Sequence, residues 1–251
     1  MKITVMTVCF NSEKTIGRTI ESVLRQTYAD FEYLIIDGKS TDNTVAVAES
    51  YRKKFEERNI DFRIISEPDN GMWDALNKGI SFANGEIIGS INSDDWYEPN
   101  ALEVVNSEYN ETHFNMFYAD LRIIKPDNSV MIKKSKMTKL LTSRGWNHPT
   151  TFVTKETYKQ YPYKTDCDYA DLDLMVRIRK DKKNRIAIKN IVIANFVSGG
   201  ISTDNRSFKN TLEMIKKRYH MYRDNEMSRL YFIDCCLIEF IKSIFYSKGV
   251  K

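Results

Sequence analysis

Two adjacent carboxylates, Asp94 and Asp95, follow an apolar run and are the residues with the clearest capacity for chemistry. Their charges repel each other, and no basic residue stands beside them in the sequence. A Mg²⁺ or Mn²⁺ ion carrying a diphosphate would offset this repulsion, since such ions take oxygen ligands and usually only one or two carboxylates from protein. The alternative is a turn and helix cap before Asn100, and the pair alone favours it.

A third carboxylate, Asp37, follows the apolar run 33–36 and leads into a polar turn. At the end of a strand, such a carboxylate can accept the N–H of a base such as uracil. An aspartate that accepts hydrogen bonds from nearby backbone amides is the alternative, and Asp37 alone favours that turn interpretation.

The elements that must position these carboxylates alternate in type through the first half of the chain. Short apolar, β-branched runs predict strands buried on both faces, and apolar residues three or four apart predict helices between them. The expected strands cover residues 3–10, 33–36, 62–66 and 86–92, and the expected helical stripes cover residues 16–24, 45–55 and 75–83.

This alternation predicts βαβ units and an α/β fold with a mostly parallel sheet flanked by helices. Ligands of such sheets bind outside the carboxyl ends of the strands. Residues 7–10, Asp37 and the pair Asp94-Asp95 all fall at such ends, so we expect them to converge on one edge of the sheet.

The second half is less regular. Residues 114–124 and 130–134 flank a turn at 126–129 and predict a hairpin. We further expect a short strand at 148–153, a helix at 168–179, a strand at 186–196 and two closing helices. No linker interrupts the chain, which favours one domain with a C-terminal helical extension.

Composition excludes several classes of protein. The chain has 251 residues, a formal net charge of +4 and no clustered basic footprint, so we expect no nucleic-acid partner. No run approaches the ~18 apolar residues of a membrane span, and the N-terminus carries no signal-like apolar segment. The spacing of Cys9, Cys167, Cys235 and Cys236 fits neither a disulfide framework nor a zinc site. Reduced thiols in a cytoplasmic protein are therefore expected.

Five short motifs occur in a characteristic order: TVCFN at 7–11, QTY at 26–28, IIDGKSTD at 35–42, NKG at 77–79 and NSDD at 92–95. Together they resemble family 2 glycosyltransferases of the GT-A fold, closely over residues 1–105 and loosely over 145–202. The resemblance implies a glycosyltransferase domain at 1–205, with a nucleotide-binding half at 1–105 and an acceptor half at 106–205. Helices at 206–251 would follow it.

The resemblance also implies roles in binding a nucleotide-sugar donor. Thr7 and Phe10 would line the nucleotide pocket, with the Phe10 ring near the base, and Asp37 would accept a hydrogen bond from the base. Asp94 and Asp95 would form the DxD-type element that contacts the ribose and a Mn²⁺ or Mg²⁺ ion. These implied roles replace the turn interpretations that Asp37 and the pair Asp94-Asp95 favour when each is considered alone.

Two positions of the donor motifs leave questions open. Many relatives have an aspartate where this chain has Asn92, so which of Asp94 and Asp95 binds the metal is open. Lys78 would help to neutralise the diphosphate, or would be a solvated helix lysine.

A catalytic base is implied in the segment 170–174, where Asp171 matches the family best and Asp173 competes. On a helix these two side chains point about 200° apart, so only one can face the site. The alternative for Asp171 is a charge that complements the helix dipole. The expected reaction is a single displacement in which Asp171 deprotonates the acceptor hydroxyl and the anomeric centre inverts.

Further contacts to donor or acceptor are expected from Trp96, His148, Gly199 and Gly200, each of which also has a purely structural alternative. The acceptor would be a saccharide or a lipid-linked saccharide, as in bacterial surface polysaccharide synthesis. The apolar C-terminal helix would contact the inner face of the membrane peripherally, pack on the domain, or form a homodimer. Asp234 and Glu239 interrupt its surface and favour packing.

The hypothesis is therefore an inverting, metal-assisted transfer of a hexosyl or N-acetylhexosaminyl group from a UDP-sugar. A dinucleotide-dependent oxidoreductase would need GxGxxG after the first strand, where this chain has CFNS. A nucleotidylyltransferase would need a glycine-rich basic loop at the same place. A non-catalytic nucleotide-sugar-binding module remains the alternative.

Overall fold

The structure is a computed structural model that describes residues 1–198 and 208–247, so Gly199 and Gly200 lie outside the described residues. Within these ranges, nine strands form one sheet, ordered β3-β2-β1-β4-β8-β6-β9-β5, with β7 paired to β6. The strands are β1 (Ile3–Cys9), β2 (Phe31–Asp37), β3 (Asp61–Ser66), β4 (Ile87–Ser90), β5 (Trp96–Tyr97), β6 (Met116–Ile124), β7 (Val130–Lys133), β8 (Phe152–Thr154) and β9 (Ile186–Val197).

The first four strands in this order, β3, β2, β1 and β4, are parallel. Every residue of β2 is buried, as its unbroken apolar sequence predicts for a strand covered on both faces. The rest of the sheet is mixed: β6 and β9 are parallel, while the remaining pairs, including the expected β6–β7 hairpin, are antiparallel. The expected α/β fold with a mostly parallel sheet is thus confirmed.

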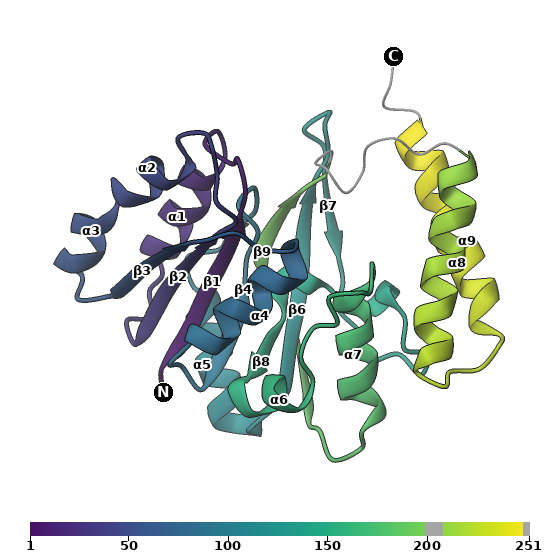
Figure 1. The fold of residues 1–251 in the computed structure, drawn as a ribbon. Coiled ribbons are helices and arrows are strands. Elements are labelled where there is room, and N and C mark those ends of the chain that lie inside the picture. The colour runs from purple at the N-terminus through teal and green to yellow at the C-terminus, as the bar shows by residue number, and fades with distance from the viewer. Residues whose placement is uncertain (199–207, 248–251) are drawn as a thin grey trace.

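Helices cover both faces of the sheet (Figure 1). One apolar core joins the sheet to α1, α2, α3 and α5, and the second joins it to α4, α6, α7, α8 and α9. The helices are α1 (Ile16–Leu24), α2 (Thr44–Glu49), α3 (Arg52–Glu57), α4 (Met72–Phe82), α5 (Ala101–Thr112), α6 (Lys155–Gln160), α7 (Ala170–Lys180), α8 (Phe208–Asp224) and α9 (Tyr231–Ser247). Within the described ranges, no helix combines the length and apolar character that crossing a bilayer requires.

Two expected elements differ in the structure. The strand at 148–153 is only β8, because His148–Thr150 form a 3₁₀ turn with Pro149 in it, and proline cannot donate to a sheet ladder. The helix expected at 45–55 is divided into α2 and α3 around Ser50 and Tyr51.

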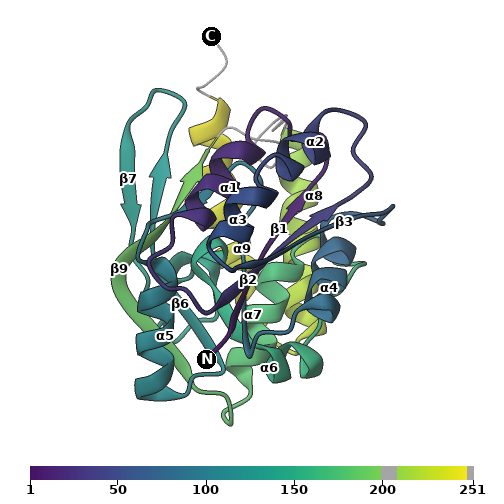
Figure 2. The same ribbon diagram turned by 90° about the vertical axis from the view of Figure 1, so that its left-hand side faces the viewer.

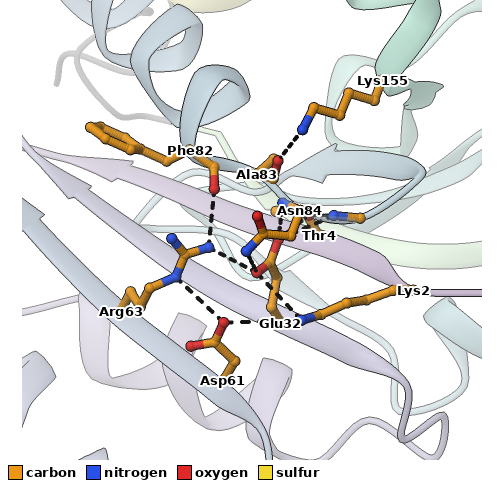
Figure 3. A network of polar contacts seen from close by, with 10 residues as sticks. Lys2, Thr4, Glu32, Asp61, Arg63, Phe82, Ala83, Asn84 and Lys155 are labelled. Atoms are coloured by element: carbon orange, nitrogen blue, oxygen red, sulfur yellow. Dashed lines mark hydrogen bonds and ion pairs between the residues drawn. The ribbon is translucent and has the colours of Figure 1, made fainter.

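The end of the sheet nearest the N-terminus is held by the buried carboxylate of Glu32 (Figure 3). It accepts hydrogen bonds from Thr4 Oγ1 at 2.6 Å and Arg63 at 2.8 Å, and from the backbone and side chain of Asn84. Burial alone would raise the pKa of Glu32, but the hydrogen bonds from Thr4 and Asn84 and the charge of Lys2 lower it to about 2. This network stabilises the sheet at the end opposite to the carboxyl ends of β1 and β2.

Candidate active site

The carboxyl ends of β1, β2 and β4 meet at one edge of the sheet, as expected. Cys9 pairs with Asp37 across the β1–β2 ladder, and Met6 pairs with Ser90 across the β1–β4 ladder. In Figures 1 and 2, β1 rises from the marked N-terminus, so this edge lies at the upper end of the molecule. The loops that follow the three strands therefore leave from neighbouring positions.

Asp95 lies at this edge and is fully buried. Its Oδ1 accepts a hydrogen bond from the backbone N–H of Val197 at 3.1 Å, while its Oδ2 is buried and has no partner among the described residues. Burial, with the neighbouring charge of Asp94 as the second cause, raises the pKa of Asp95 to about 8. An unpaired buried oxygen is costly, so a cation bound to it would stabilise the ionised carboxylate.

Helix α1 holds the loop that carries this pair. Arg18 donates to the backbone oxygen of Asp94 at 2.6 Å, and Thr19 Oγ1 donates to the backbone oxygen of Asp95 at 2.6 Å. The Arg18 guanidinium also stacks over the Trp96 ring at 4.0 Å from its centroid. These contacts fix the backbone of the loop and leave the partly exposed Asp94 carboxylate without a hydrogen bond to any described side chain or backbone group. Trp96 thus supports the loop from the side of β5.

The acidic pair fits a hard divalent cation of the Mg²⁺ or Mn²⁺ kind. No group of three or more His, Cys, Asp or Glu side chains suited to a metal occurs in the part of the chain that the structure describes. Such ions are usually bound through one or two carboxylates together with substrate phosphates. The unpaired oxygen of Asp95 and the open carboxylate of Asp94 supply that set.

Asp37 is fully buried and is bonded to its own turn and to the ends of β1 and β3, where Cys9 Sγ donates to it at 3.6 Å. Its carboxylate accepts from the backbone N–H of Ser40 at 3.0 Å, from Ser40 Oγ at 2.5 Å and from Ser66 Oγ at 2.6 Å. The turn role weighed from the sequence is therefore present. A base contact at Asp37 would have to replace one of these two hydroxyl donors.

Thr7 and Phe10, both expected in the nucleotide pocket, differ sharply in exposure. Thr7 is fully buried, and its hydroxyl is 2.9 Å from the Tyr33 hydroxyl on β2, so it supports the sheet from inside. Phe10 is 59% exposed and precedes Asn11, whose φ of 50° turns the chain sharply at the end of β1. Of these two side chains, only the Phe10 ring is accessible for stacking on a base.

Lys78 is bound to the loop before its own helix. Its Nζ donates to the Pro68 oxygen at 2.6 Å and pairs with Glu67 at 3.1 Å and Asp74 at 3.8 Å. The hydrogen bond to Glu67 is the largest cause of the raised pKa of Lys78. These contacts anchor the loop 67–71 on α4.

The two aspartates at the start of α7 have different surroundings. Asp173 is buried and bonds Lys164 at 2.9 Å, Arg177 at 2.6 Å and Asn225 at 2.7 Å. Burial would raise the pKa of Asp173, but these three partners lower it. Asp171 is partly exposed, and its Oδ1 accepts only from the backbone N–H of Leu172 at 2.8 Å among the described groups. Asp173 is thus occupied by structure, and Asp171 is available.

An aromatic cluster lies beside Asp171. His148 Nε2 is 3.1 Å from the Tyr163 hydroxyl, and the Trp73 ring stacks on Tyr163 with centroids 5.5 Å apart. Burial lowers the pKa of His148, while the charge of Asp171 acts in the opposite direction. Asn77 fixes Tyr163 by accepting from its backbone N–H at 3.0 Å and donating to its backbone oxygen at 2.8 Å. The cluster therefore joins α4 to the loop that precedes α7.

Sequence reasoning did not predict this cluster as a unit. Asn77 in the NKG motif and His148, an expected donor or acceptor contact, were the available signals, but their shared partner Tyr163 lies 86 residues after Asn77. Two cavities lie farther along α7. Arg177 and Lys180 line one of about 400 Å³, and Arg179 lines the other, of about 300 Å³. Neither is lined by a predicted site residue.

Fold and site together define a class: an α/β protein whose parallel strands have an acidic pair at their carboxyl ends. Comparison with known proteins makes this specific. The sequence model of glycosyl transferase family 2 matches residues 4–185, so the chain belongs to that family.

Individual relatives and a solved structure are also similar to this chain. The chain is 29% identical over 227 residues to a chondroitin synthase of Pasteurella multocida, covering 88% of this chain and 22% of that protein. The chain thus spans about a fifth of that synthase. It is 26% identical over 242 residues to the Escherichia coli UDP-Glc:alpha-D-GlcNAc-diphosphoundecaprenol beta-1,3-glucosyltransferase WfgD, covering 92% of this chain and 90% of that protein. The structure of S. aureus TarS 1–349 in complex with UDP-GlcNAc superposes with a TM-score of 0.70 at 18% identity, covering 100% of this chain and 76% of that one. This last likeness confirms the GT-A fold.

Proposed function

We propose that this chain transfers a sugar from a UDP-sugar to a hydroxyl group of a saccharide or lipid-linked saccharide. The observation that carries the proposal is the buried, unpaired Oδ2 of Asp95 beside the open carboxylate of Asp94. Family membership supports the reaction type. The full-length similarity to a glucosyltransferase named for a diphosphoundecaprenol acceptor supports the acceptor class.

The donor would lie across the carboxyl ends of β1, β2 and β4. Phe10 would stack on the base, and the turn built by Asp37 would border it, with Thr7 supporting both strands from below. Asp94 would contact the ribose and share the metal with Asp95. A Mn²⁺ or Mg²⁺ ion bound there would offset the negative charge on the leaving diphosphate. Lys78 would hold the loop 67–71. Its positive charge would then lie near the diphosphate without contacting it directly.

Asp171 would act as the general base. In the reaction, its carboxylate takes the proton of the acceptor hydroxyl while that oxygen forms a bond to the anomeric carbon. The bond from this carbon to the diphosphate oxygen breaks at the same time, and the configuration inverts. Support for Asp171 over Asp173 comes from their contacts, since Asp173 is committed to Lys164, Arg177 and Asn225.

The acceptor would approach over Trp73 and His148, which are partly exposed and pack on the buried Tyr163. Aromatic rings that stack at the edge of a site suit the apolar faces of sugars, and His148 offers a polar edge beside them. Trp96 would support the acidic loop from the donor side, and Gly199 and Gly200, which lie outside the described residues, stay predicted donor contacts. We retain the division into halves at 1–105 and 106–205, because donor groups come mainly from the first and acceptor groups mainly from the second.

The decisive experiment is calorimetric binding of UDP with and without Mn²⁺, followed by donor turnover. We expect binding that strengthens at least tenfold with Mn²⁺, an effect that Asp95→Asn abolishes. Released UDP is then measured with UDP-glucose and UDP-GlcNAc, with and without saccharide acceptors. Equal binding with and without metal would overturn the donor-site assignment. Tight metal-dependent binding without turnover on any acceptor would instead indicate a nucleotide-sugar-binding module.

A further inference from the structure

One stretch of the chain has charge of a single sign. Between Asp127 and Glu156 there is no aspartate or glutamate, whereas Lys133, Lys134, Lys136, Lys139, Arg144 and Lys155 all fall there. We call residues 128–155 the basic segment. The side chains of Lys134, Lys136, Lys139 and Arg144 are exposed. Lys134 pairs with the buried Asp120 at 2.8 Å and Arg144 with Asp234 at 2.7 Å, whereas Lys136 and Lys139 have no ion pair among the described residues. The positive charge that this stretch presents to solvent therefore comes mainly from Lys136 and Lys139.

The basic segment also exposes large apolar side chains. Three consecutive residues of β7 are exposed, so both faces of this short edge strand are open, and Met137 and Leu140 are 58% and 59% exposed in the loop that follows. An exposed apolar edge strand is a liability for a protein that remains in solution, and clustered exposed apolar residues mark interaction surfaces.

Helix α9 carries a second exposed apolar surface. Leu230 just before it, and Ile233, Leu237 and Ile241 within it, are spaced three or four residues apart and are each about half exposed or more, with Leu230 at 72%. We call these four residues the α9 stripe. The acidic residues expected to interrupt this surface point inward instead.

Those two acidic residues join the helix to the protein interior. Asp234 is buried and pairs with Arg144 at 2.7 Å, and Glu239 is fully buried and pairs with Arg218 at 2.7 Å. The expectation that Asp234 and Glu239 break the apolar surface was therefore wrong, because both lie on the side of the helix that faces arginines. The α9 stripe is left without a charged side chain among its four members.

Direct contacts hold the basic segment against the helical pair. The backbone N–H of Leu141 donates to the Tyr231 hydroxyl at 2.9 Å, Arg144 pairs with Asp234, and Arg218 donates to Ser143 Oγ at 2.6 Å. In Figures 1 and 2 the tip of the β6–β7 hairpin and the far end of α9 lie at the same end of the molecule. The carboxyl end of β1, with the candidate active site, lies at that end too.

We propose that the basic segment and the α9 stripe together form a surface that docks on an anionic membrane. Apolar side chains entering the interface beside lysines and arginines are the combination that anionic bilayers bind. A second copy of this chain is disfavoured as the occupant of the whole surface, because a two-fold contact through it would bring two basic segments into one interface. The proposal concerns binding alone and does not depend on the transferase reaction.

The test is co-sedimentation of the full chain with vesicles, without sugar nucleotide. We expect binding to mixed phosphatidylglycerol–phosphatidylcholine vesicles and little binding to pure phosphatidylcholine. Because each basic residue near an anionic surface contributes about fivefold in affinity, Lys136→Glu with Lys139→Glu should weaken binding at least about tenfold at low salt. Leu230→Ser with Ile233→Ser should weaken it by a similar factor, and this loss should persist at high salt.

Matched controls separate docking from general effects. Lys53→Glu with Lys183→Glu reverses two exposed lysines elsewhere, and Met72→Ser with Phe82→Ser changes two exposed apolar residues of α4. Both controls should bind vesicles within about twofold of the unmodified chain, and circular dichroism establishes that each variant is folded. Failure of the unmodified chain to bind anionic vesicles would overturn the proposal. Equal vesicle binding by all variants would also overturn it. So would a dimer of the unmodified chain that does not bind vesicles and that Leu230→Ser with Ile233→Ser abolishes.

Discussion

Asp95 and Asp173 are both buried aspartates, yet their surroundings are opposite. Asp173 contacts two cationic side chains and one amide, and its pKa is lowered. Within the part of the chain that the structure describes, Asp95 accepts one backbone hydrogen bond and keeps one oxygen unpaired, and its pKa is raised to about 8. Burial acts in the same direction on both, so the number of partners decides the outcome.

The comparison shows which carboxylate of each acidic pair is held by the protein and which is available to a ligand. In Asp171-Leu172-Asp173 the buried member is satisfied by protein and the partly exposed member is available. In Asp94-Asp95 the buried member keeps one oxygen, Oδ2, without a partner among the described residues, and such an oxygen calls for a further ligand. Substitutions at Asp171, Asp95, Asp94 and Asp173 would break or sharpen this contrast, and Tyr163→Phe tests the aromatic cluster beside Asp171.

The largest expected effect is on turnover in Asp171→Asn. Removing a general base typically slows a reaction by about 10² to 10⁴-fold. We expect the released-UDP assay to lose at least about 100-fold in kcat, while calorimetric binding of UDP with Mn²⁺ stays within about twofold. The same change at the exposed Asp166, five residues earlier, should leave both measurements unchanged. Full activity in Asp171→Asn would remove it as the base.

Asp95→Asn should have the next largest effect and should distinguish metal binding from stability. We expect at least about tenfold weaker Mn²⁺-dependent UDP binding, because the amide cannot replace a negatively charged ligand. We also expect no loss of melting temperature in the absence of metal, since the change removes an unpaired buried carboxyl group. Asp94→Asn is the companion variant: whichever of the two abolishes the metal dependence identifies the main metal ligand. A Tm decrease of several degrees in metal-free Asp95→Asn would mean that the carboxylate is structural.

How far the sequence predicted these roles depends on where the partners lie. The strands β1 to β4 and the edge that their ends form follow from local patterns, because each strand is a short apolar run. The choice between Asp171 and Asp173 does not, since Asp173 is satisfied by Lys164, nine residues away, and by Asn225, 52 residues away. The same holds for Asp234 and Glu239, whose inward orientation depends on Arg144 and Arg218. Local patterns identify carboxylates, and only the tertiary fold supplies their partners.

Asp173→Asn should affect stability more than turnover. Removing one partner of a buried ion pair costs about 3 kcal/mol, so we expect the urea midpoint to fall while the folded fraction keeps its activity. The folded-state pKa of Asp173 is lowered, so its contribution is present above its unfolded pKa of 3.8 and is lost as pH falls through the folded value. The stability difference between the two proteins should therefore shrink in acid. Asp181→Asn, at the far end of the same helix, is the control and should cost less than about 1 kcal/mol.

The smallest expected effect tests whether the aromatic cluster acts on the acceptor side. Tyr163→Phe keeps the ring that stacks on Trp73 but removes the hydroxyl 3.1 Å from His148. We expect about a fivefold to tenfold rise in KM for the acceptor and a shift in the pH profile of kcat/KM, with unchanged UDP binding, because His148 loses a polar neighbour beside Asp171. Tyr161→Phe removes a comparable hydroxyl that bonds Asp181 and should change neither quantity. If both variants behave alike, the cluster only packs α4 against the loop before α7, and the acceptor is held elsewhere.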